Sequence, residues 1–408
     1  MRYGWSLLLA FLLVLESRAQ AGKRLWVLEA PDQMVEYDLG AFAAVAHVTV
    51  PKRLLEHPQY LSVNARGQLL FQLPRDVEIA GGETAAAGHR AWLWDGRQPR
   101  EFPLGDRQVF LAADGQSLVW FENRFVTAAG ADGRERSVRA SARVWRTNLA
   151  GAAEQTLVAI PASASCQCTT GTCSESCPEW SMWAPDGAVA DSFLMTRFVP
   201  GQLEATYERT VLYRRASERW QPAPLAEPLE SVLAASPRGD VLIAAVIDPG
   251  CCGWLNEGND QAVVLNNGRR SVLFDETERF NNRNYDVSFY ATTAHLAPGR
   301  TVTAQTITSD APAAANGDIR LSSDGKASAD ELARVRRAIA EMPMVEIVRL
   351  ASPPQTVATI RHVAVVGWMN DRELLVAEGG HLAVYDASGK KIKDTPVRVR
   401  GAADAFLR

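Results

Sequence analysis

The side chains with the greatest chemical reactivity in this sequence are its cysteines. There are 6 of them in 408 residues, and they form one cluster of four and one adjacent pair: Cys166, Cys168, Cys173, Cys177, Cys251 and Cys252. Four thiolates could bind zinc, but the spacing within the cluster differs from the paired C-x₂-C pattern of structural zinc sites. An even number of cysteines in an exported chain instead favours disulfides, whose pairing the sequence leaves open.

The stretch that contains the adjacent cysteines also gathers oxygen ligands and one aromatic side chain. Its carboxylate and amide residues are Asp248, Asn256, Glu257, Asn259 and Asp260. Calcium takes about six to eight such oxygens, so these residues form a calcium candidate, although their order does not match an EF-hand loop. An ordinary solvated loop is the alternative interpretation. Trp254 lies in the same stretch, and its ring could anchor a ligand together with Asn256, Glu257 and Asp260.

Recognisable catalytic motifs are missing from the sequence. The 6 histidines are scattered along the chain, and no nucleophile elbow, paired-histidine zinc motif, phosphate loop or dinucleotide fingerprint is present. The segment 276–286 repeats the acidic and amide composition of the calcium candidate more weakly, and we expect it to be a loop. The sequence therefore does not support catalysis, and it predicts no cofactor beyond the calcium candidate.

The N-terminus has the composition of a secretory signal peptide. Arg2 supplies a positive charge, residues 7–15 form a nearly unbroken apolar run, and Ala19-Gln20-Ala21 places small residues at the two positions that a signal peptidase reads. The apolar run is shorter than the roughly 20 residues that span a bilayer, although a retained anchor helix is the alternative. We expect residues 1–21 to be removed and residues 22–408 to fold in the periplasm or outside the cell, without a membrane anchor.

The distribution of charge excludes one class of partner. The chain has 43 lysine and arginine residues against 47 aspartate and glutamate residues, for a formal net charge of -4. Acidic and basic residues are interspersed, so the sequence lacks the basic stripe that binds nucleic acid or an anionic membrane. The expected partner is a protein, a peptide or a glycan.

A turn followed by a short apolar strand recurs along the chain. In its fullest form it is Ser236-Pro237-Arg238-Gly239, in which Pro presets φ at the second turn position and Gly provides the positive φ that closes the turn. Related turns occur at 64–67, 113–115, 184–187, 297–299 and 370–371. Second hairpins, with Asp-Gly, Asn-Gly or Ser-Gly turns, follow at 95–96, 267–268 and 388–389.

Four short strands per unit, repeated about every 50–70 residues, are typical of a β-propeller. We count seven units, so the predicted fold class is all-β, with a single propeller domain of seven four-stranded blades over residues 22–408. The first unit supplies only three strands, at 25–29, 34–39 and 46–50. We expect residues 397–400 to add the fourth strand, because this would close the ring and remove two exposed sheet edges.

The turns at 184–187 and 236–239 carry a family resemblance. Ala-Pro-Asp-Gly and Ser-Pro-Arg-Gly, each followed by an apolar strand, resemble the repeats of TolB-like, WD-type bacterial β-propellers. The Trp-Asp and Gly-His signatures of true WD repeats are missing. The resemblance implies the propeller architecture over nearly all of the mature chain. It also implies a binding scaffold more readily than an enzyme, because most such propellers bind partners.

One segment departs from the strand pattern. Residues 328–341 predict a helix that begins with a cap at Ser328 or at Ala329-Asp330, carries an apolar stripe and stops at Pro343. It lies within an insertion at about 311–343 in the sixth blade. If the strands of each blade run outward from the axis, three segments join strands at the same face of the ring. They are this insertion, the cysteine-rich loop 161–178 and the stretch around Cys251. Loops held by a rigid scaffold are where binding usually occurs, so that face is the predicted site.

These observations lead to three functional hypotheses. The leading one is an exported binding scaffold that holds a protein, peptide or glycan on its disulfide-braced face. The alternative is a propeller enzyme of the lactonase or quinoprotein kind, with a metal or cofactor at the axial mouth. Some quinoprotein propellers do place adjacent cysteines and a nearby tryptophan against their cofactor. The third hypothesis is a structural module of the cell envelope.

Overall fold

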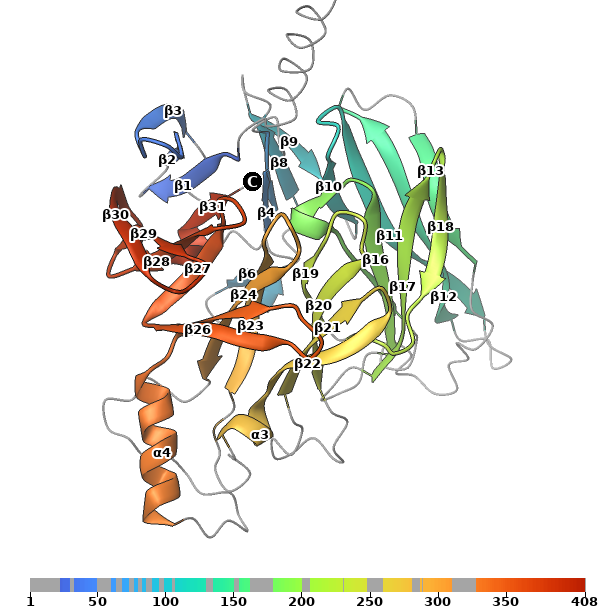
Figure 1. Cartoon of the computed structure of the whole chain (residues 1–408). Helices are drawn as coiled ribbons and strands as arrows, with labels where there is room; N and C mark the ends of the chain where they lie inside the picture. The colour runs from blue at the N-terminus through green and yellow to red at the C-terminus, as the bar shows by residue number, and fades with distance from the viewer. Residues whose placement is uncertain are drawn as a thin grey trace, which may run out of the picture.

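The computed structural model describes residues 23–29, 33–49, 60–63, 68–72, 77–79, 83–85, 90–94, 99–104, 107–129, 135–149, 154–161, 179–199, 206–229, 231–247, 260–280, 287, 289–309 and 328–407. Strands dominate these residues. Seven mainly antiparallel sheets stand around a common centre as the blades of a propeller, and the chain passes from one blade to the next around the ring (Figure 1). The predicted all-β, seven-bladed fold is therefore confirmed.

Consecutive strands pair within each blade, so the chain zigzags outward before it enters the next blade. Blade one contains β1 (Leu25–Glu29), β2 (Gln33–Tyr37), β3 (Ala44–Thr49) and the C-terminal β31 (Ala405–Leu407). Blade two contains β4 (Tyr60–Val63), β5 (Leu69–Gln72), β8 (Arg90–Trp94) and β9 (Pro99–Pro103). Blade three contains β10 (Gln108–Ala112), β11 (Ser117–Ala129), β12 (Glu135–Asn148) and β13 (Glu154–Ile160). Blade four contains β14 (Glu179–Trp183), β16 (Ser192–Val199), β17 (Thr206–Ala216) and β18 (Arg219–Pro224).

The remaining blades repeat this order. Blade five contains β19 (Ser231–Ala235), β20 (Val241–Ile247), β21 (Asp260–Asn266) and β22 (Arg269–Asp275). Blade six contains β23 (Phe289–Leu296), β24 (Val302–Ser309), β25 (Met344–Arg349) and β26 (Gln355–Arg361). Blade seven contains β27 (Val363–Trp368), β28 (Glu373–Glu378), β29 (His381–Asp386) and β30 (Lys391–Arg398). The connections contain the β6–β7 hairpin (Val77–Ile79 and Glu83–Ala85), β15 (Ala188–Val189), the short 3₁₀ helices η2 (Pro185–Gly187) and η3 (Ala402–Asp404), and the helices α3 (Glu276–Phe280) and α4 (Ala329–Ala340).

The two ends of the chain meet in blade one, but through a different strand from the one expected. β31 pairs antiparallel with β1, so that Leu25 lies opposite Leu407. The predicted closing segment 397–400 is wrong, because Val397 and Arg398 end β30, which pairs with β29 as the outermost strand of blade seven. The chain then turns through η3, where the Arg400 guanidinium binds both carboxylate oxygens of Asp404 at 3.0 Å. This turn places β31 at the inner edge of blade one.

Apolar side chains fill the spaces between neighbouring blades. Successive side chains of a strand point to opposite faces of its sheet, so each blade presents one set to the blade before it and one to the blade after it. Trp26 of blade one is fully buried and meets Trp94 of blade two edge to face, with 5.8 Å between the ring centroids. Trp368 of blade seven is also buried, and its indole donates a hydrogen bond to the His295 carbonyl of blade six at 3.0 Å. These tryptophans therefore serve inter-blade packing.

The second hairpin of blade three is much longer than expected. The apolar run after the turn at 113–115 predicts a strand over residues 118–121. The pairing of β11 with β12 instead continues to Ala129 opposite Glu135, with an irregularity between Arg124 and Phe125. Main-chain hydrogen bonds between the two strands do not require apolar side chains, so the apolar run alone underestimates the hairpin.

The helix predicted in blade six is confirmed as α4. Ser328 caps it and forms a capping box with Glu331, whose amide donates to the Ser328 hydroxyl at 3.2 Å. Val335 is the buried residue of the helix, with Leu332 and Ile339 partly buried beside it. The apolar stripe therefore rests on the propeller, while the other sides of the helix face outward. No helix among the described residues is long and apolar enough to cross a membrane.

A buried carboxylate ties the connection between blades five and six to blade six. Glu346 of β25 has 1% of its side chain exposed, and it accepts a hydrogen bond from the amide nitrogen of Gln305 at 3.1 Å. The guanidinium of Arg279, in α3, forms an ion pair with the other carboxylate oxygen and lies over the Phe280 ring at 5.4 Å. Because a charge in the interior is costly without a partner, the ion pair with Arg279 compensates the burial of the Glu346 carboxylate.

Removal of Arg279 alone is expected to lower the free energy of unfolding more than removal of both charges of the pair. Arg279→Ala leaves the Glu346 carboxylate buried and unpaired, which should lower the free energy of unfolding by about 3 kcal/mol in denaturant titrations. The double variant Arg279→Ala/Glu346→Gln should recover most of this loss, because its neutral amide can still hydrogen-bond to Gln305. A double variant as unstable as Arg279→Ala, or a single variant as stable as the parent, would contradict this account of the buried pair.

Candidate functional site

The residues that the sequence predicts as a site lie almost entirely outside the described residues. They are Cys166, Cys168, Cys173, Cys177, Asp248, Cys251, Cys252, Trp254, Asn256, Glu257 and Asn259. The predicted signal peptide, residues 1–21, lies outside them as well. Disulfides, calcium binding and ligand binding by these residues therefore stay predictions. The exception is Asp260, which begins β21 and whose main chain lies opposite Ile247 of β20, so it belongs to the blade rather than to the loop.

The described strands show where the connections that carry these residues begin and end. Residues 161–178 join β13 to β14, residues 248–259 join β20 to β21, and residues 310–343 join β24 to β25. Strands of an antiparallel blade alternate in direction. The second strand and the fourth, outermost strand therefore end on the same side of the ring, so the link from second to third strand and the link to the next blade both lie there. We call this end the loop face. Both α3 and α4 also belong to connections of this end, and they lie at the bottom of Figure 1.

The segment expected as the weaker acidic loop begins with a helix. Residues 276–280 form α3, and the Asp275 carboxylate accepts a hydrogen bond from the Glu278 amide at 2.8 Å. Glu276 is 2% exposed and accepts a hydrogen bond from the Phe289 amide at 2.6 Å. Both carboxylates therefore bind main-chain amides. The sequence pattern missed this, because the helix is too short to show an apolar period.

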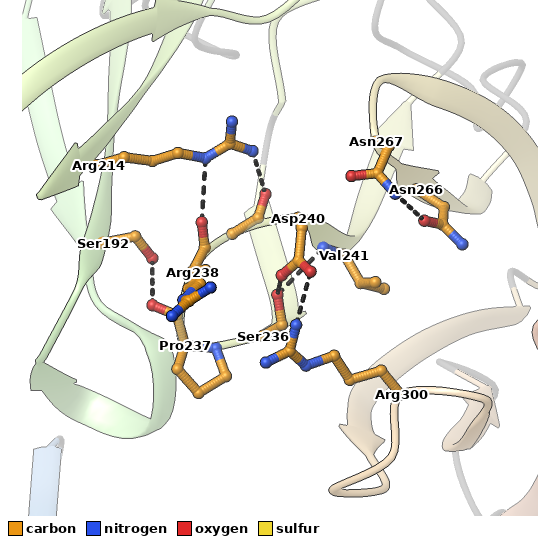
Figure 2. A network of polar contacts seen from close by, with 11 residues as sticks. Ser192, Arg214, Ser236, Pro237, Arg238, Asp240, Val241, Asn266, Asn267 and Arg300 are labelled. Atoms are coloured by element: carbon orange, nitrogen blue, oxygen red, sulfur yellow. Dashed lines mark hydrogen bonds and ion pairs between the residues drawn. The ribbon is translucent and has the colours of Figure 1, made fainter. Parts of the chain in front are cut away.

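At the opposite end of the ring, the turns between the first and second strands of the blades form what we call the turn face. The turn 236–240 of blade five is held from blade four (Figure 2). Ser192 donates a hydrogen bond to the Pro237 carbonyl at 2.9 Å, and Arg214 donates to the carbonyls of Arg238 and Gly239, each at 3.0 Å. Gly239 has φ of +65°, and a Cβ atom there would lie 2.6 Å from the Leu212 side chain. The repeated turn therefore fastens one blade to the next.

The other side of the same turn is held from blade six. The hydroxyl of Ser236 hydrogen-bonds to the Asp240 carboxylate and accepts from the Val241 amide at 3.1 Å. Arg300, in the equivalent turn of blade six, binds the second Asp240 oxygen at 2.6 Å (Figure 2). Burial alone would raise the pKa of Asp240, but hydrogen bonds from Ser236 and its own amide, together with the Arg300 guanidinium, hold this pKa below its ordinary value.

The connection 184–191 of blade four crosses to the centre of the ring. The sequence predicts a simple turn there, but η2 is followed by β15, which pairs in parallel with β10 so that Ala188 lies opposite Leu111. η2 also lies against β4 and β19. Because β4, β10 and β19 are the innermost strands of blades two, three and five, a segment that reaches all three must lie at the axis. Gly187 (φ +70°) approaches so closely that an added Cβ would lie 2.7 Å from the Ser62 hydroxyl.

Beside this connection, a cleft of about 350 Å³ opens on the turn face between blades three and four. Residues that line it include Asp114, Arg146, Leu157, Asp191, Arg215 and Trp220. Asp114 and Arg146 bind each other at 2.7 Å. Sequence reasoning missed this cleft, since its residues come from separate strands and turns of two blades and share no local motif. No group of three or more acidic, histidine or cysteine residues that could hold a metal is found among the described residues.

The sheets and their closure define the class of the protein: it is a seven-bladed β-propeller. No protein-family model matches the chain, and comparison with curated protein sequences gave no match either. Several solved structures are similar to it at low identity. Apo AztD from Citrobacter koseri is 10% identical, with a TM-score of 0.42 over 95% of this chain and 97% of AztD.

Two enzymes are similar to this chain in structure, with identities and TM-scores in the same range. An oligogalacturonate lyase in complex with manganese is 10% identical, with a TM-score of 0.41 over 87% of this chain and 82% of the lyase. Prolyl oligopeptidase B from Galerina marginata is 9% identical, with a TM-score of 0.46 over 94% of this chain and 51% of the peptidase. These scores are too low to transfer any activity to this chain, and the propeller assignment rests on its own sheets.

The Asp240 network is expected to contribute to stability in a pH-dependent way. Because the folded state lowers the pKa of Asp240, its contribution is present above the ordinary aspartate pKa of about 4 and is lost as the pH falls through the lower folded value. Asp240→Asn should therefore lower stability by about 1 kcal/mol at pH 7, and the difference from the parent should shrink below about pH 4.

A suitable control is Glu154→Gln, which breaks the ion pair of Glu154 with Arg143. Glu154 is 57% exposed, so its removal should cost less than about 0.5 kcal/mol. Urea unfolding at a series of pH values gives the comparison. An Asp240→Asn deficit that grows as the pH falls would contradict the proposed sign.

Proposed function

We propose that this propeller is an exported binding scaffold that holds a protein, peptide or glycan on its loop face. The observation that carries the proposal is the concentration of long connections at that face. Residues 161–178, 248–259 and 310–343 all leave the blades there, whereas the turns at the other face are short or are fastened to neighbouring blades. A ring of sheets holds such connections at defined positions, which is what recognition of a partner requires.

Helix α4 is the described element best placed to meet a partner. Its apolar stripe is already used for attachment to the propeller, and Arg334 and Arg337 lie exposed away from that stripe. An inserted helix with one buried residue contributes little to the packing of the ring. Its outward side is therefore better explained by contact with another molecule than by the needs of the fold.

Export completes the proposal. A signal peptide at residues 1–21 would deliver the mature chain to an oxidising compartment, where the six cysteines can form disulfides that brace the loop face. We also propose that the chain is related to the TolB-like propellers. This relationship is supported by the turns at 184–187 and 236–239, and the second of these fastens blade five to its neighbours.

Photo-crosslinking in the native host tests the binding face. A photoreactive amino acid at position 334 or 337 of α4 is expected to give crosslinked adducts. The same residue at position 238 on the turn face, or at 392 on the outer strand of blade seven, should give at least about tenfold fewer. Arg238 and Ile392 are both exposed, so accessibility is matched. Adducts at the turn face alone, or at none of the four positions, would contradict the proposal.

Intact-mass measurement of the protein purified from its native compartment tests export and bracing together. The mature chain should begin at Gly22, and alkylation of the denatured, unreduced protein should modify none of its cysteines. Reduction before alkylation should expose all 6. Six free thiols without reduction, bound zinc in stoichiometric amount or an uncleaved N-terminus would each overturn the part of the proposal that it addresses.

A further inference from the structure

The cleft between blades three and four contains charges of both signs that the described residues leave unmatched. The Arg215 side chain donates one hydrogen bond, from Nε to the Ser217 carbonyl at 3.2 Å. Its other guanidinium nitrogens, and the carboxylates of Asp191 and Glu218, have no hydrogen bond or ion pair in the part of the chain that the structure describes. All three charged side chains line the cleft. The Arg215 amide donates to the Asp191 carbonyl at 2.8 Å, which keeps the two residues adjacent.

An aromatic wall and an apolar floor lie beside these charges. Trp220 of β18 is opposite Arg215 of β17 in the strand register, so both side chains project from the same side of blade four. The Trp220 ring is held by the fully buried Phe193, with 4.8 Å between the ring centroids. Leu157 and Val119 line the cleft from blade three. The cleft therefore offers a fixed aromatic surface next to groups that can bind a positive and a negative charge.

We propose that this cleft binds a small zwitterion, namely a free amino acid or a short peptide with an apolar side chain. The Arg215 guanidinium pairs with the ligand carboxylate through charge-assisted hydrogen bonds, for which its planar shape is suited. Asp191 and Glu218 receive the ligand ammonium group. Trp220 and Leu157 cover the apolar side chain, which is removed from water by both blades.

Charge and size favour this ligand class over simpler ones. An anion would face two carboxylates, and a simple cation would leave Arg215 unmatched. The volume of about 350 Å³ lies near the lower end of the roughly 300–1,000 Å³ of small-molecule sites, which suits an amino acid or a dipeptide. The cleft opens on the turn face, so this binding is independent of a partner at the loop face.

Isothermal titration calorimetry of the mature, full-length protein tests the proposal with leucyl-leucine as the probe. Saturable binding at one site is expected. N-acetyl-leucine methylamide, which keeps the side chain but has no charged ends, should bind at least about tenfold more weakly. Arg215→Gln and Asp191→Asn should each weaken leucyl-leucine binding by about tenfold, as should Trp220→Ala. Arg219→Gln should leave binding unchanged, because Arg219 is exposed beside the cleft without lining it.

Several outcomes would overturn the proposal. One is the absence of saturable binding by leucyl-leucine and by free leucine up to ~10 mM. Another is equal binding of the uncharged analogue. A third is binding of a neutral sugar such as maltose in place of the zwitterions, which would assign the cleft to a glycan. Arg215→Gln and Asp191→Asn change exposed side chains, so an unchanged melting temperature confirms that these variants fold and makes their binding result decisive.

Discussion

The hydrogen bonding of β31 to β1 is the interaction on which the rest of the structure depends. It joins residues from opposite ends of the chain, Leu25 with Leu407 and Val27 with Ala405, and so converts a row of seven sheets into a ring. In arrays of repeated units, each unit is stabilised mainly by its neighbours, and an unclosed array has an open sheet edge and an exposed apolar face. Here Leu407 and Ala405 complete the cluster that blade one shares with blade seven.

Closure of the ring brings residues from different blades into contact at each of its two faces. On the turn face, the ion pair of Asp240 with Arg300 and the hydrogen bonds from Ser192 and Arg214 join blades four, five and six at short distances. The blade-four connection can reach three inner strands only because the ring brings them to one centre. On the loop face, α4 packs against the same ring through Val335. A preorganised frame loses little conformational freedom when a partner binds, which supports the binding role that we propose.

Local sequence patterns predict most of the blades but not the contacts that join distant segments. Gly-containing turns and alternating strands identify the seven units, and a capping residue at the start of the segment 328–341 with an apolar stripe behind it predicts α4. The closing strand has only three residues and no turn signal of its own, whereas residues 397–400 alternate valine with arginine as a strand does, so the sequence favours the wrong segment. The cleft residues could not be predicted either, because Arg215, Trp220 and Leu157 come together only when blades three and four pack.

Hydrogen–deuterium exchange tests the closure most directly, in the full chain and in a variant that ends at Gly401 and therefore lacks β31. Ring closure predicts slow exchange of the β1 amides in the full chain. In the shortened chain these amides should exchange at least ~100-fold faster, while β16 and β17 of blade four exchange at rates much closer to those of the full chain. Equal protection of β1 in the two proteins would show that the pairing of β31 with β1 does not hold the ring together.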